Sequence, residues 1–271
     1  MLNKTKVILI SACLALTTFG LTACGDSTSS SASSEVSSAL PFIQPETAAP
    51  SSAPVEPTTK AKKDDSPPGY KVEPTDPDFV DGDFGFYRLS GTEVKVSTYN
   101  GSSKNVEIPA SVQGMAVTAI ERDLFNRSDI ESVTIPNTVT EIGNYAFSQC
   151  QSLKEIVIPE GVKTIGTHAF WYCKNLEKVT LPKTVEKIGP YAFSATGVTS
   201  LEIPDGQLNS LSEYVFFQCW NLTEITIPQS VTSIDKSAFT DCPNDMVISA
   251  YADSAAANYA KTHGYRLNTL S

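Results

Sequence analysis

Apolar residues return every 23 positions along the second half of the chain, and within each unit they alternate with polar residues over one short segment. In the unit that begins at Leu153, Ile156 and Ile158 lie on either side of Val157, which predicts a short strand with two apolar side chains on one face. Pro159 ends this strand because proline lacks an amide donor and fixes φ. Five phenylalanines mark the period: Phe147, Phe170, Phe193, Phe216 and Phe239.

One such unit buries too few apolar side chains to offset the ordering of its own backbone, so its stability must come from stacking on neighbouring units. Further units begin at Ile130, at Leu176, near Val198 and at Leu222, and the fourth is irregular at residues 206–208. The pattern predicts a β-rich repeat solenoid with a parallel sheet, in which each unit is one coil.

Glycine recurs at one position of the unit, as Gly143, Gly166 and Gly189, and Asp235 takes that position in the fifth unit. The predicted reason is either a turn that needs a positive φ or a close approach of two backbones.

Both ends of a solenoid expose apolar faces, so caps are expected. We assign residues 70–105 to an N-terminal cap, 106–244 to the repeats and 245–271 to a C-terminal cap. The first cap is predicted to contain a β-hairpin between Phe84 and Tyr99. In the second, Asp253 is expected to cap a helix from Ser254 to His263, which Gly264 ends before residues 265–267 return as a strand.

The first 24 residues have the pattern of an export signal, in which Lys4 and Lys6 precede an apolar run. The signal ends in Leu-Thr-Ala-Cys24, which resembles the lipobox of bacterial lipoproteins. That resemblance implies lipidation at Cys24 and an extracytoplasmic, membrane-anchored location at the bacterial cell surface. The alternative is an uncleaved membrane helix, but threonines and Gly20 leave the apolar stretch short of the ~20 residues that span a bilayer. Residues 25–69 are rich in Ser, Pro, Ala and Thr and are predicted to form a disordered stalk.

The repeats themselves, with the pattern I-P-x-x-V-x-x-I-G-x-x-A-F-x-x-C, resemble the BspA-like, treponemal class of leucine-rich repeat. The match spans residues 84–267. The resemblance implies a leucine-rich-repeat solenoid wound as a right-handed coil, and similar proteins include adhesins that bind host matrix or neighbouring cells.

Charge and composition narrow the function further. Twenty Lys and Arg against 30 Asp and Glu give a net charge of -10, which disfavours nucleic acid as a partner. The chain has only two histidines, His168 and His263, and lacks the sequence motifs of serine hydrolases, zinc proteases and phosphate loops. We therefore expect no enzymatic activity, no catalytic residue, no metal and no cofactor.

Four cysteines keep the phase of the phenylalanines: Cys150, Cys173, Cys219 and Cys242. Disulfides, a metal site and buried free thiols are the alternatives. Parallel side chains on adjacent coils keep their Cβ atoms too far apart for a disulfide, and a line of sulfurs does not converge on a metal ion. Buried free thiols are favoured. The acidic segment 76–83 resembles a calcium loop, but its spacing and its lack of a twelfth-position Glu favour a solvated linker end.

Two surfaces remain as candidates for binding. The first is the outward face of the strands, with Ser132, Thr134, Glu155, Val157, Lys178, Thr180, Glu202, Glu224 and Thr226. The second is an aromatic rim with Trp171, Tyr172, Phe217 and Trp220, for which packing beneath the turns is the alternative. We expect adhesion to a protein partner at the cell exterior. The alternatives are an accessory glycan- or cell-wall-binding lipoprotein and a structural spacer that binds nothing.

Overall fold

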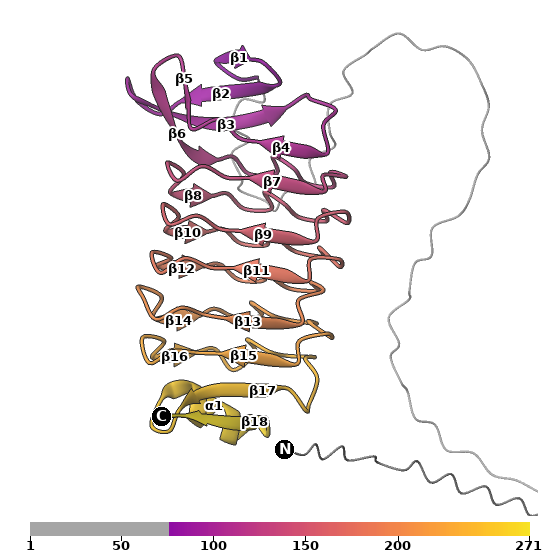
Figure 1. The fold of residues 1–271 in the computed structure, drawn as a ribbon, viewed down its shortest axis with the longest axis vertical. Helices are drawn as coiled ribbons and strands as arrows, with labels where there is room; N and C mark the ends of the chain where they lie inside the picture. Colours follow the sequence, from indigo (N-terminus) through magenta and orange to yellow (C-terminus); the bar gives the residue numbers. More distant parts are fainter. Residues whose placement is uncertain (1–75) are drawn as a thin grey trace, which may run out of the picture. The chain divides into compact units, whose positions relative to one another are not determined.

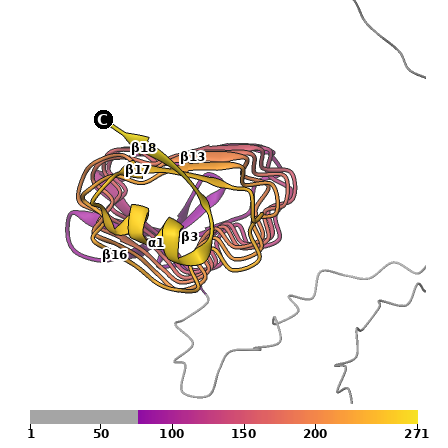
Figure 2. The ribbon, with the colours of Figure 1, turned by 90° about the horizontal axis from the view of Figure 1, so that it is seen from below.

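The computed structural model describes residues 76–271. The export signal, Cys24 and the stalk predicted for residues 25–69 therefore fall outside the described residues, and the domain boundaries given above stay predictions. From residue 76 onward the chain winds into a stack of coils (Figure 1), which lie over one another when seen along the stack (Figure 2). The predicted parallel-sheet solenoid is confirmed.

Each coil contributes two short strands on different sides of the stack. The first side carries β4 (Asn105–Glu107), β7 (Ser132–Thr134), β9 (Glu155–Val157), β11 (Lys178–Thr180), β13 (Ser200–Glu202), β15 (Glu224–Thr226) and β17 (Val247–Tyr251). The second side carries β6 (Met115–Ile120), β8 (Glu141–Ile142), β10 (Thr164–Ile165), β12 (Lys187–Ile188), β14 (Ser210–Leu211) and β16 (Ser233–Ile234). We call the outward surface of the first series the strand face.

Neighbouring strands on the strand face pair in parallel and in register with the repeat. Ile156 of β9 lies opposite Val179 of β11, and both are buried, whereas the residues on either side of them point outward. The hydrogen-bonded ladder is not continuous, because β4–β7, β9–β11 and β13–β15–β17 form separate groups. The strand face is thus interrupted between β7 and β9 and again between β11 and β13.

The third side of each coil contains turns, yet hydrogen bonds still join the coils there. The N–H groups of Tyr145 and Phe147 donate to carbonyls of the next coil, at 3.0 and 2.8 Å, while the N–H of Ala146 closes a local turn. N–H groups that donate to the next coil thus alternate with N–H groups that close local turns. This alternation requires left-handed backbone at two places in each turn, and φ lies between 54° and 60° at these residues. They are Tyr145, His168, Tyr191 and Tyr214 at the first place and Gln149, Tyr172, Ala195, Gln218 and Asp241 at the second.

The recurring glycines Gly143, Gly166 and Gly189 are needed because no side chain fits between the coils at these positions, and not because their backbone has a positive φ. Among the described glycines, positive φ occurs only at Gly82, Gly114 and Gly264. A Cβ at Gly166 would instead lie 2.6 Å from the backbone nitrogen of Asn144 on the preceding coil. Of the two predicted reasons, the close approach of backbones is correct and the positive φ is wrong.

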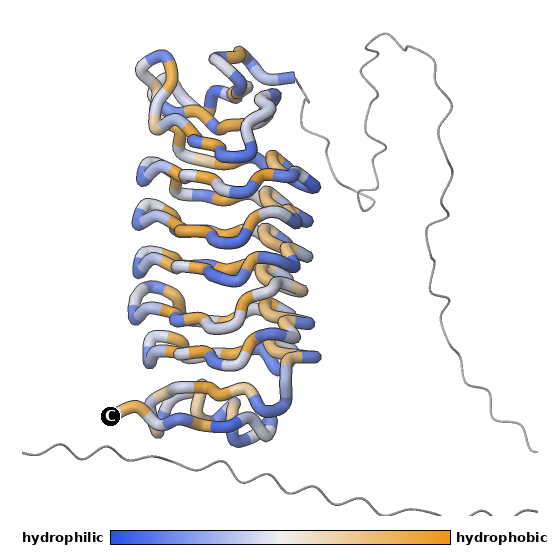
Figure 3. The backbone as a smooth tube through the Cα atoms, turned by 45° about the vertical axis from the view of Figure 1, so that its right-hand side comes forward, coloured by the Kyte–Doolittle hydropathy of each residue, from blue (hydrophilic) through white to orange (hydrophobic). Residues whose placement is uncertain are grey.

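The core is a column of phenylalanine rings, one from each coil. Phe147, Phe170 and Phe193 are fully buried, and their ring centroids are 5.1 and 5.2 Å apart with nearly parallel planes. Apolar segments of the backbone recur at the same place in successive coils (Figure 3). Each ring therefore fills the space between two neighbours, which explains why the 23-residue period is held most strictly at these positions.

At the N-terminal end the predicted hairpin is formed by β2 (Phe84–Arg88) and β3 (Glu93–Tyr99), with a register shift between Gly85 and Phe86. The edge of this hairpin is extended by β1 (Phe79–Asp81), which the sequence pattern did not predict. A second, smaller hairpin joins β5 (Ser111–Val112) to β6. The rings of Phe84 and Tyr99 continue the aromatic column to Phe125.

At the C-terminal end α1 (Ala255–His263) lies across the last coil, and β18 (Arg266–Leu270) pairs in parallel with β17. The N-cap is Ser254, whose side chain accepts a hydrogen bond from the N–H of Ala257 at 3.1 Å. The prediction that Asp253 caps this helix is wrong by one residue, whereas Gly264 ends it as expected, with φ of 79°. With both ends covered, residues 76–271 enclose a complete apolar core.

Candidate binding surface

The strand face presents the predicted residues outward. Eight of the nine are exposed and Thr226 is half-buried. Strand pairing places Glu155 directly opposite Lys178, and Val157 opposite Thr180. Val157 is 61% exposed, so an apolar side chain faces solvent among these mostly polar residues. The face is therefore exposed to solvent and mostly polar.

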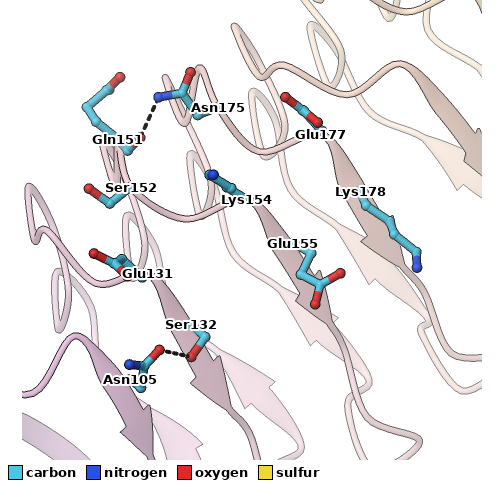
Figure 4. A pocket seen from close by; sticks show the side chains of 10 residues that line it. All are labelled: Asn105, Glu131, Ser132, Gln151, Ser152, Lys154, Glu155, Asn175, Glu177 and Lys178. Carbon is cyan, nitrogen blue, oxygen red and sulfur yellow. Dashed lines mark hydrogen bonds between the residues drawn. The ribbon is translucent and has the colours of Figure 1, made fainter.

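A hollow of about 800 Å³, which we call the polar groove, opens on this face across β4, β7, β9 and β11 and the chain that leads into them (Figure 4). It includes the interruption between β7 and β9. No apolar side chain lines it. Its lining residues are Asn105, Glu131, Ser132, Gln151, Ser152, Lys154, Glu155, Asn175, Glu177 and Lys178.

Hydrogen bonds hold several of the neutral side chains in place. The hydroxyl of Ser132 donates to the side-chain oxygen of Asn105 at 2.7 Å, and the amide of Asn175 donates to the carbonyl of Gln151 at 2.7 Å (Figure 4). The amide of Gln151 in turn donates to the carbonyl of Tyr172 at 2.6 Å. These bonds link adjacent coils and hold the floor of the groove in place.

Among the residues that line the groove, sequence reasoning placed Ser132, Glu155 and Lys178 on the candidate binding surface. It missed the positions that precede each strand, such as Glu131, Lys154 and Glu177, because alternation marks only the residues within the strand. A signal was present, since these positions are polar in every regular unit. The strand face and the entry to each strand form one surface.

The predicted aromatic rim is not one surface. Trp171 packs edge-on against His168, with 5.8 Å between ring centroids, and Phe217 packs edge-on against Tyr214 at 5.6 Å. Both are half-buried. Tyr172 and Trp220 are exposed, Trp220 by 59%, but they belong to coils two repeats apart. Packing thus accounts for two of the four aromatic residues.

The half-buried rings pack onto a second aromatic column on the turn side. Tyr145, His168 and Tyr191 stack with centroid distances of 4.7 Å, and Tyr214 extends the stack at 4.9 Å. Nδ1 of His168 is buried without a hydrogen-bond partner. Burial lowers the pKa of this imidazole, so it is neutral at physiological pH and serves as a flat ring in the stack.

The four repeat cysteines are buried free thiols, as predicted. Each thiol donates to the carbonyl of the phenylalanine on the preceding coil, at 3.0 Å for Cys173 and 3.1 Å for Cys219. Burial raises the pKa of Cys219 to about 11 and also raises that of Cys173 and Cys242. Protonated, hydrogen-bonded thiols are poor nucleophiles and poor metal ligands, and their role here is to join coils.

Within residues 76–271 no group of three or more His, Cys, Asp or Glu side chains is placed to hold a metal ion. The carboxylate of Asp78, in the segment that resembles a calcium loop, accepts a hydrogen bond from the N–H of Arg88 at 2.7 Å. The only α-helix in this part of the chain, α1, is too short to cross a bilayer.

Comparison with known proteins agrees with this geometry. Residues 118–245 match the family model for the BspA type leucine-rich repeat region, in six copies. The repeats in residues 118–245 are therefore leucine-rich repeats of the BspA type. Proteins of this type are often surface-associated or act in protein interactions, and no catalytic family is indicated.

Solved structures of bacterial leucine-rich-repeat proteins are similar to this chain. The Treponema pallidum leucine-rich-repeat protein is 18% identical over 70% of this chain and 97% of its own, with a TM-score of 0.52. A leucine-rich-repeat protein from Bacteroides capillosus is 30% identical over 41% of this chain and 86% of its own, with a TM-score of 0.39. A leucine-rich cell surface protein from Faecalibacterium prausnitzii is 20% identical over 63% and 75%, with a TM-score of 0.26. A comparison with curated proteins found no match to the chain.

Proposed function

We propose that this chain is a binding protein of the bacterial cell exterior that contacts a protein partner through its strand face and polar groove. The observation that carries the proposal is the exposure of the strand face. Its column through Thr134, Val157 and Thr180 is flat and solvent-exposed, although the core behind it is fully packed. The apolar side chain of Val157 among polar ones, beside a groove with fixed hydrogen bonds, supports contact with a protein partner, because protein interfaces combine apolar and polar contacts.

The N-terminal segments complete the proposal. A lipid on Cys24 would hold the chain at the membrane, and the stalk would carry the solenoid away from it. Partner recognition then belongs to the solenoid alone, because the stalk composition provides few large side chains for specific contacts.

The test is a pull-down with the soluble chain from residue 25 onward, against extracts of extracellular matrix and of bacterial cell wall. The strand-face variant Thr134→Arg/Val157→Arg/Thr180→Arg should lose the captured partner. The control variant is Glu141→Arg/Thr164→Arg/Lys187→Arg, which changes three residues that are paired with one another on β8, β10 and β12. Its net charge rises by the same amount as that of the strand-face variant. Retention of the partner by the first variant, or its loss by the second alone, would contradict the proposal.

Binding of carbohydrate is the second candidate, and the exposure of Trp220 favours it, because exposed aromatic rings stack on sugar faces. Trp220→Ala should then abolish capture of cell-wall glycans and leave capture of the protein partner unchanged. If only the glycan is captured from the extracts, and only by way of Trp220, the carbohydrate role replaces the protein role.

A further inference from the structure

Four charged side chains in the polar groove form no ion pair with any part of the described chain. They are Lys154 and Glu155 on one coil and Glu177 and Lys178 on the next, and we call them the charged quartet. Strand pairing places Glu155 opposite Lys178, and Lys154 precedes Glu177 by one repeat of 23 residues. Opposite charges therefore alternate both along each coil and between coils.

The solenoid contains a matched pair that shows what this spacing permits. Lys163 and Glu186 lie on the same two coils, in the same order and 23 residues apart, and their charged atoms are 3.4 Å apart. The distance between coils thus allows an ion pair between Lys154 and Glu177, which does not form. In Figure 4 the ammonium group of Lys154 points away from the carboxylate of Glu177. The groups of the quartet are exposed to solvent, and none of them makes a side-chain hydrogen bond or ion pair within residues 76–271.

This arrangement selects ligands by charge pattern. The quartet has no net charge, so it offers no long-range attraction to a simple anion or cation. A ligand that carries only positive or only negative charges is attracted by two groups of the quartet and repelled by the other two. A ligand that carries both charges can form a favourable contact with all four groups. Because the strands are about 4.8 Å apart and an extended peptide advances about 3.4 Å per residue, a peptide can place charges over both coils at once.

We propose that the polar groove binds an extended peptide segment of the partner protein that carries acidic and basic side chains within a few residues of each other. The proposal rests on the proposed protein-binding function and specifies the chemistry of the partner. The fixed amides of Asn175 and Gln151 beside the quartet provide further polar contacts for the peptide backbone.

The test uses synthetic peptides of about 12 residues, long enough when extended to cross the groove. One alternates Lys and Glu, a second alternates Lys and Ser, and a third alternates Glu and Ser. Fluorescence anisotropy measures their binding to the soluble chain at low salt and at physiological ionic strength, where the Debye length is about 8 Å. We expect the mixed peptide to bind about fivefold or more tightly than either single-sign peptide, and its affinity to fall as salt rises.

The decisive variant is Lys154→Glu/Glu155→Lys, which keeps the net charge but turns the alternating quartet into two stripes of like charge. It should lose the preference for the mixed peptide. The matched control, Lys163→Glu/Glu186→Lys, exchanges the paired charges on the same coils and should keep that preference. Thermal unfolding of both variants checks that they fold, which is expected because all four side chains are exposed.

The inference is overturned if the single-sign peptides bind as well as the mixed one, if the stripe variant keeps the preference, or if no peptide binds. Its failure can be told apart from failure of the proposed function. A partner that is captured in the pull-down by the stripe variant as well as by the parent would refute the role of the groove and leave the strand face as the binding surface. If neither partner nor peptide binds the parent chain, both proposals fail.

Discussion

Replacing Gly166 with alanine tests the central packing argument, that successive coils approach each other too closely at this position for any side chain. The added Cβ would lie 2.6 Å from the backbone nitrogen and 2.7 Å from the side-chain oxygen of Asn144. Since real Cβ contacts essentially never fall below 3.0 Å, the two coils must separate locally. Two hydrogen bonds span this contact, from Gly166 N–H to the carbonyl of Ile142 and from Thr167 N–H to Asn144, both 2.8 Å long.

Overpacking costs about 1 to 3 kcal/mol, and each weakened hydrogen bond adds about 0.5 to 1.5 kcal/mol. We therefore expect Gly166→Ala to lower the free energy of unfolding by about 2 to 6 kcal/mol, measured by urea denaturation with circular dichroism and fluorescence as coincident probes. Gly91→Ala is the control, because a Cβ there meets no atom within 4 Å, and it should stay within about 0.5 kcal/mol of the parent. A loss below about 1 kcal/mol for Gly166→Ala, or an equal loss for both variants, would refute the argument.

Three further outcomes follow from the core and the turn side. Phe170→Ala should destabilise the chain by about 3 to 5 kcal/mol in the same denaturation assay, against less than about 0.5 kcal/mol for the exposed Val157→Ala, and equal effects would contradict the ring column. Thiol reagents at pH 8 should label Cys219 only after denaturation, because it is buried and its pKa is about 11, and rapid labelling of the folded chain would disprove this. The unfolded imidazole of His168 takes up a proton near pH 6.5 and the folded one only at lower pH, so stability should fall as the pH drops through 6.5. His168→Tyr introduces the residue that the neighbouring coils have at this position, and it should remove this part of the acid sensitivity. Denaturation curves at pH 7.5 and 5.5, each about one unit from 6.5, measure the difference.

The fold could be predicted because the same physical requirement is repeated in every coil. Each phenylalanine must fill the gap between two neighbours, and each strand must end at its proline, so a 23-residue period in Phe147 to Phe239 carries the same information five times. The caps were predictable for a related reason, since an uncovered ring column would expose Phe125 at one end and Phe239 at the other. Tyr99 and Tyr259 contact these two rings.

The errors arose where the residues are compatible with more than one local structure. A recurring glycine is compatible with positive φ and with close packing, and only coordinates separate the two. Left-handed backbone falls instead on Tyr145 and Gln149, residues that the sequence does not mark for it, because hydrogen bonds to the next coil stabilise a conformation that costs about 1 kcal/mol or more. At the C-terminal helix, Asp253 and Ser254 are both good N-caps, and the position of the last turn of chain selects the serine.

The binding surface was only partly predictable, and the charged quartet shows why. Repeat periodicity determines which slots face outward, and so it placed Glu155 and Lys178 on the strand face correctly. It does not determine how long side chains in those slots are directed, because each has several rotamers of similar energy. Lys163 and Glu186 form an ion pair while Lys154 and Glu177, at the same spacing on the same coils, do not. In the proposed peptide-binding role this difference decides which charges are free to contact a partner, so repeats that share a fold and a period would differ in what they recognise.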